Sequence, residues 1–178
     1  MKFSELSSSA KDKVREWWCS DCDSDFEYVL EDAAQVASIL GLSIDSGCIF
    51  YSLGYCQGDH AGFRGRYMFN TNALTKLAEY APKDEELKAI AEQLMTDFVA
   101  ARCLGVEFTI QCCERRYSMT TEVVEDVDYD AKLSRQALER LASWIYDRLV
   151  AEDEYRRSDE SLTEVLADHD FNEDGSII

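Results

Sequence analysis

The chain has one proline, two histidines and no long apolar run, and each scarcity excludes a class of protein. A single proline together with 46% hydrophobic residues is unlike the composition of disordered chains. Because no stretch of about 18 apolar residues occurs, we expect no transmembrane helix. The N-terminal stretch MKFSELSSSAKDKVREWW also lacks the apolar core of a signal peptide. We therefore expect a cytoplasmic protein in which residues 1–178 form a single globular domain.

Recognisable catalytic and nucleotide-binding motifs are missing as well. The sequence contains no Walker loop, no Rossmann fingerprint, no HExxH pair and no EF-hand spacing. His60 and His169 have no nucleophile at a spacing typical of acid–base catalysis. We therefore predict no catalytic residues, no cofactor and a protein that is not an enzyme.

Seven cysteines in a chain without a secretion signal favour free thiols over disulfides. Cys19 and Cys22 form a CxxC pair, and Cys112 with Cys113 could complete a set of four zinc ligands. Adjacent residues of a strand point to opposite faces, however, so Cys112 and Cys113 are poorly placed to bind one ion. We favour thiols without a metal.

Positive charge is also scarce. Thirty-six acidic residues against 18 basic ones give a formal net charge of −18. From Glu122 to Ile178 there are 17 acidic and 6 basic residues. This composition disfavours direct contact with nucleic acid or anionic membranes and favours rapid association with basic surfaces. A soluble protein with a solvated acidic surface is the simpler explanation.

Apolar residues recur at intervals of three and four in six stretches, which predicts six helices. Two β-rich pairs of segments predict four strands. The result is an α+β protein in the order ααββααββαα, with an antiparallel four-stranded sheet of two hairpins and helices packed on one face. The expected helices span 4–18, 26–40, 73–80, 85–102, 129–155 and 158–167, and the expected strands span 43–54, 62–70, 106–112 and 116–124.

The first hairpin, Cys48 to Phe69, carries the most unusual sequence of the chain. Its loop, CQGDHAG, combines turn-forming glycines with an adjacent acid and imidazole. A purely structural loop explains these residues, and so does a recognition loop that contacts a partner. The candidate contacts of such a loop are Tyr55, Gln57, Asp59, His60 and Arg64.

This hairpin resembles a family of uncharacterised bacteriophage and prophage proteins that share a YSGFWSQGDGAxFxG-type motif. The matching elements here are Tyr51-Ser52, Gln57-Gly58-Asp59 and the run from Ala61 to Gly65. The chain departs from the motif at Leu53-Gly54, at Tyr55 in place of Trp, at Cys56 and at His60. The resemblance implies a phage or mobile-element origin, and some members carry antitoxin-like labels.

Three functional hypotheses follow. The leading one is a phage-encoded inhibitor that occupies the basic, nucleic-acid-binding surface of a host defence complex, such as a CRISPR effector. The alternatives are an antitoxin-like partner that binds through the hairpin loop, and an enzyme with an undescribed site at that loop. A homodimer is compatible with an open sheet edge. The candidate contacts of the acidic surface are Glu152, Asp153, Glu154, Asp159, Glu160 and Glu164.

Overall fold

The computed structural model describes residues 1–21, 26–54, 58–100, 107–115, 118–123 and 132–178. The chain divides into two compact units. Unit 1 consists of Met1–Phe26 and Leu149–Ile178, so it contains both termini, and unit 2 consists of Glu27–Arg148. Helix α5 (Lys132–Arg156) begins in unit 2 and ends in unit 1. None of the described helices is both long and apolar enough to cross a bilayer.

Unit 2 contains an antiparallel sheet arranged around β3 (Ala61–Met68). On one edge, β3 pairs with β4 (Glu107–Arg115), which pairs in turn with β5 (Ser118–Val123). On the other edge, β3 pairs with two short strands, β1 (Leu42–Ser43) and β2 (Ile49–Tyr51). The predicted α+β class is confirmed.

The first predicted strand is wrong in its extent, and the sheet has five strands rather than four. A 3-10 turn, η2 (Ser46–Cys48), separates β1 from β2 where we expected one strand over 43–54. The sequence Asp45-Ser46-Gly47 favours a turn, and the N–H of Cys48 donates to the carbonyl of Asp45 across 2.7 Å. Both short strands nevertheless pair with β3, because the chain returns to the same edge after the turn.

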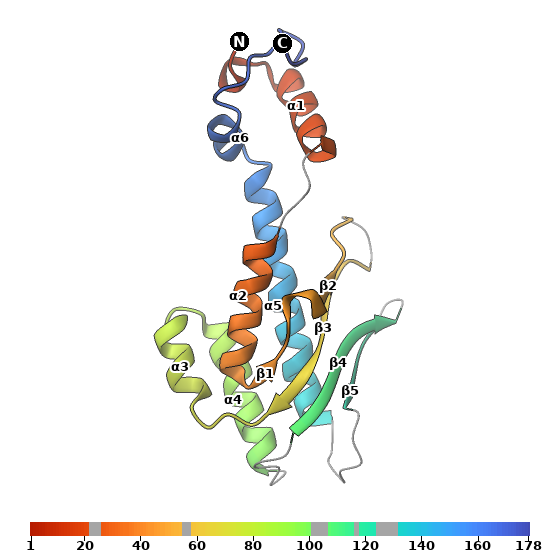
Figure 1. Cartoon of the computed structure of the whole chain (residues 1–178), viewed down its shortest axis with the longest axis vertical. Helices are drawn as coiled ribbons and strands as arrows, with labels where there is room; N and C mark the ends of the chain where they lie inside the picture. Colours follow the sequence, from red (N-terminus) through yellow and green to blue (C-terminus); the bar gives the residue numbers. More distant parts are fainter. Residues whose placement is uncertain (22–25, 55–57, 101–106, 116–117, 124–131) are drawn as a thin grey trace. The chain divides into compact units, whose positions relative to one another are not determined.

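Side chains along β3 alternate between core and solvent. Ala61, Phe63 and Tyr67 are buried, whereas Arg64 and Arg66 are exposed. This alternation is typical of an antiparallel sheet with one covered face. Figure 1 shows three helices of unit 2 together on one side of the strands: α2 (Glu27–Leu40), α3 (Ala73–Tyr80) and α4 (Glu85–Ala100).

Local signals set several helix ends in unit 2. Helix α2 ends at Leu40 and is followed by Gly41, whose φ of 96° is a conformation that glycine adopts without strain. Asp84 caps α4 by accepting the N–H of Leu87 across 3.0 Å. Asn72 precedes α3 but makes no side-chain cap, because its φ and ψ of −99° and 6° are not extended. Instead, Asn70 accepts the N–H of Asn72.

Unit 1 has a core of its own, built from the two ends of the chain. It contains a 3-10 turn, η1 (Phe3–Glu5), the helices α1 (Ser8–Asp21) and α6 (Asp159–Val165), and the end of α5. The N-terminal amine donates to the carbonyl of Phe171 across 2.8 Å, and the N–H of Phe171 donates back to Met1. Trp17 and Trp18 pack against this core. The buried residues of the core are Phe3, Leu6, Ala10, Val14, Leu162, Leu166 and Phe171.

Candidate partner-binding surfaces

The loop between β2 and β3 is held by its own polar groups. The hydroxyl of Ser52 donates to Oδ1 of Asp59 across 2.8 Å, and Nδ1 of His60 lies 2.7 Å from the carbonyl oxygen of Gly58. Gly58 has a φ of 111°, which the turn requires. These contacts give Asp59 and His60 a structural role in closing the loop. Arg64 is exposed on β3.

Tyr55 and Gln57, the other two predicted loop contacts, lie outside the described residues. In the described part of the loop, Asp59 and His60 therefore stabilise the loop conformation, and Arg64 is an exposed cation. We find there no arrangement of a nucleophile, a base and a substrate cavity.

The six predicted acidic contacts have different environments in unit 1. Asp153 is 5% exposed and accepts from Arg157 across 2.9 Å. Glu152 accepts from Arg156 one helical turn away, across 2.7 Å. Both acids therefore pair with bases four positions later in the chain.

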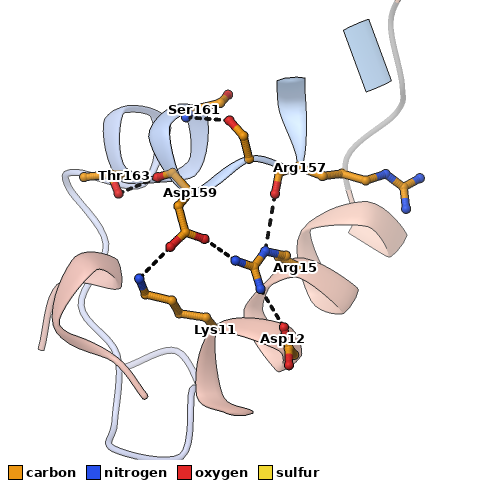
Figure 2. A network of polar contacts seen from close by, with 8 residues as sticks. Lys11, Asp12, Arg15, Arg157, Asp159, Ser161 and Thr163 are labelled. Carbon is orange, nitrogen blue, oxygen red and sulfur yellow. Dashed lines mark hydrogen bonds and ion pairs between the residues drawn. The ribbon is translucent and has the colours of Figure 1, made fainter. Parts of the chain in front are cut away.

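Asp159, at the start of α6, joins that helix to α1. Figure 2 shows Lys11 and Arg15 of α1 converging on its carboxylate, with 2.7 Å between Nζ of Lys11 and Oδ2. Arg15 also donates to Asp12 and to the carbonyl of Arg157. The hydrogen bond from Lys11, and next that from Arg15, lower the pKa of Asp159 below its usual value, although burial opposes them. Asp159 is therefore a structural acid.

Glu154, Glu160 and Glu164 are the predicted contacts that are exposed and form no ion pair with described residues. They belong to a larger set of unit 1 carboxylates that are exposed and make no ion pair within the part of the chain that the structure describes. We call this set the acidic surface, and its members are Glu5, Glu16, Glu154, Glu160, Glu164, Asp168, Glu173 and Asp174.

The basic residues of unit 1 are, by contrast, almost all engaged. Unit 1 contains 16 acidic and 6 basic residues. Five of the six bases form ion pairs with acids of the same unit: Lys2, Lys11, Arg15, Arg156 and Arg157. The charge that unit 1 offers to a partner is therefore almost entirely negative.

Unit 2 contains a cleft of about 730 Å³ whose lining includes a polar cluster of Asp84, Trp144 and Arg148. The sequence did not predict this cluster. Asp84 accepts hydrogen bonds from Trp144 and Arg148 of α5 across 2.9 and 2.8 Å. Burial tends to raise the pKa of Asp84, but the hydrogen bonds from Leu87, Trp144 and Arg148 together lower it. The capping position of Asp84 was the only sequence signal for this cluster. The polar atoms of the cluster form hydrogen bonds with one another, which is typical of a contact that joins two helices.

The described residues contain no group of three or more His, Cys, Asp or Glu side chains that could hold a metal ion. Cys22 lies outside the described residues, and the structure describes only the backbone of Cys19, Cys112 and Cys113. The alternatives of zinc or free thiols at these positions stay open. Cys48 is a free, exposed thiol.

Comparison with known proteins identifies a family but no characterised relative. No curated protein and no solved structure matches the chain. A family model described as a domain of unknown function (DUF8835) matches residues 26–159. This range contains the whole of unit 2 and of α5. It leaves out α1 entirely and all of α6 except its first residue, Asp159. The chain therefore belongs to the uncharacterised family DUF8835.

Proposed function

We propose that this chain is a protein-binding inhibitor that presents the acidic surface of unit 1 to a basic surface of a nucleic-acid-handling protein. Its carboxylates stand in for phosphates and exclude the nucleic acid that the partner would otherwise bind. The target that fits the resemblance of the hairpin to phage proteins is a host defence complex. Such a protein acts by binding and needs no catalytic site.

The observation that supports this proposal is that most bases of unit 1 form ion pairs, whereas many of its described acids do not. Five of its six bases form ion pairs within the unit, whereas eight of its described carboxylates are exposed and form no ion pair with described residues. Exposed charges of one sign contribute little to folding stability and repel one another. A binding role for the acidic surface explains why so many like charges share a small unit.

The test is affinity capture from bacterial lysate with a matched pair of charge variants. The first variant carries Glu154→Gln, Glu160→Gln and Glu164→Gln on unit 1. The control carries Glu79→Gln, Glu85→Gln and Glu92→Gln, three exposed acids of unit 2, and has the same net charge.

We expect the wild type and the control to retain a nucleic-acid-binding protein at low salt and to release it at high salt. The unit 1 variant should retain much less of it. Equal retention by both variants would contradict the proposal. Capture that is insensitive to salt would instead favour the alternative that the hairpin loop, with Arg64, makes the contact.

A further inference from the structure

Four aromatic side chains of unit 1 form a row of neighbouring rings. The ring centroids of Trp18 and Trp17 are 6.0 Å apart, those of Trp17 and His169 are 6.3 Å apart, and those of His169 and Phe171 are 6.5 Å apart. The row is buried at Phe171, exposed at His169 and half-buried at the two tryptophans.

Members of the acidic surface adjoin this row in the sequence. Glu16 immediately precedes Trp17, and Asp168 immediately precedes His169. Both carboxylates are exposed. A partner side chain that contacts Trp17 or His169 therefore has an exposed carboxylate on the neighbouring residue of the chain.

This chain already binds its own cations with that combination of groups. The guanidinium of Arg148 lies 5.0 Å from the ring centroid of Trp144 and pairs with Asp84. Arg156 lies 5.0 Å from the ring centroid of Phe26 and pairs with Glu152. A ring supplies the negative face of its π-system and a carboxylate supplies the charge, so the two act on the same cation.

A third example of this pairing lies within unit 1. Lys11 lies 5.3 Å from the ring centroid of Phe3 and pairs with Asp159. In each of these three examples, one cation contacts both an aromatic ring and a carboxylate.

We propose that the row Trp18–Trp17–His169 is an anchor for an arginine side chain of the partner, with the neighbouring carboxylates pairing with its guanidinium. This inference rests on the proposed function and specifies its recognition chemistry. Arginine is favoured over lysine because its planar guanidinium stacks on aromatic rings and also forms bidentate pairs with carboxylates.

The three residues of the anchor lie on the two terminal segments, outside residues 26–159, which match the family model.

The experiment titrates the full chain with hexa-arginine and, separately, with hexa-lysine, and follows the indole N–H signals by NMR. The chain has three tryptophans. We expect the signals of Trp17 and Trp18 to shift on binding, while Trp144, whose N–H is held by Asp84 in unit 2, serves as an internal reference. Hexa-arginine should bind about two- to fivefold more tightly than hexa-lysine, the range of an exposed cation–π contact.

Two variants distinguish the contribution of the anchor to binding from that of the acidic surface. His169→Ala changes an exposed residue and should abolish the preference for arginine. Glu160→Gln with Glu164→Gln should weaken binding of both peptides by the same factor. If both peptides bind equally to the wild type and His169→Ala changes nothing, the anchor is wrong and the acidic surface stands. If neither peptide binds, both the anchor and the proposed function are wrong.

Discussion

The indole N–H of Trp144 donates a hydrogen bond to Oδ2 of Asp84, with 2.9 Å between the nitrogen and the oxygen. Arg148 donates to the same oxygen and stacks over the Trp144 ring. The other oxygen of Asp84 accepts the N–H of Leu87 in the first turn of α4. One carboxylate therefore both caps α4 and fixes it to α5.

Asp84→Ala should lower the free energy of unfolding by about 2–3 kcal/mol. Loss of a helix cap costs about 1 kcal/mol, and a buried indole N–H without an acceptor costs about 1–3 kcal/mol. Glu85→Ala is the matched control, because that neighbouring side chain is 80% exposed. Urea unfolding of both variants measures the difference. Equal stability of the two variants would show that the Asp84 cluster contributes nothing.

Gly41→Ala should destabilise the chain by about 1–3 kcal/mol, the cost of a strained backbone conformation. Its φ is 96°, and an added Cβ would lie 2.3 Å from the carbonyl oxygen of Met68. Gly47→Ala is the control, because a Cβ there would meet no atom within 4 Å. In thermal unfolding, the melting temperature of Gly47→Ala should be close to that of the wild type, and the melting temperature of Gly41→Ala should be well below it. A similar melting temperature for both would contradict the conformation at Gly41.

Asp153→Asn should cost about 1–3 kcal/mol, because it leaves the charged group of Arg157 without its buried carboxylate. Glu154→Gln, one residue later and exposed, should change stability by less than about 0.5 kcal/mol. Chemical denaturation of the two variants tests which of these acids is structural. If Asp153→Asn left the stability unchanged, Asp153 would not be a structural acid and could contact a partner.

Stability should fall in acid, and Asp159 should contribute to that fall. Its pKa in the folded chain is below its usual value of 3.8, chiefly because Lys11 donates to it. The unfolded chain therefore binds more protons, so the stabilisation is present above pH 3.8 and is lost as the pH drops through the lower folded pKa.

The comparison of wild type with Asp159→Asn tests this dependence. Melting temperatures measured between pH 7 and pH 3 should fall less steeply for Asp159→Asn, which cannot titrate. The pKa values of Asp84 and Glu86 are also lowered, so the variant keeps part of the slope. Parallel profiles for the two proteins would show that the contact of Asp159 with Lys11 and Arg15 contributes no pH-dependent stability.

The sequence determined the helices because their signals are local. Helix α3 has the predicted bounds, Ala73–Tyr80, and α2 begins one residue after its predicted start and ends at Leu40 as expected. Apolar periodicity and capping residues act within a few positions, so they can be read without knowing the rest of the fold. The order of pairing in the sheet is different, because the pairing of β1 and β2 with β3 joins residues that are up to 25 positions apart, from Leu42 to Tyr67.

The sequence by itself also determined how much negative charge this protein carries, since charge is a sum over residues. Only the tertiary structure decided which acids are exposed. Asp153 and Glu154 are neighbours in the sequence, yet the first is buried against Arg157 and the second faces solvent. Asp159 pairs with Lys11, 148 positions away. No periodicity or spacing predicts such a pair, because it exists only where the fold brings the two ends of the chain together.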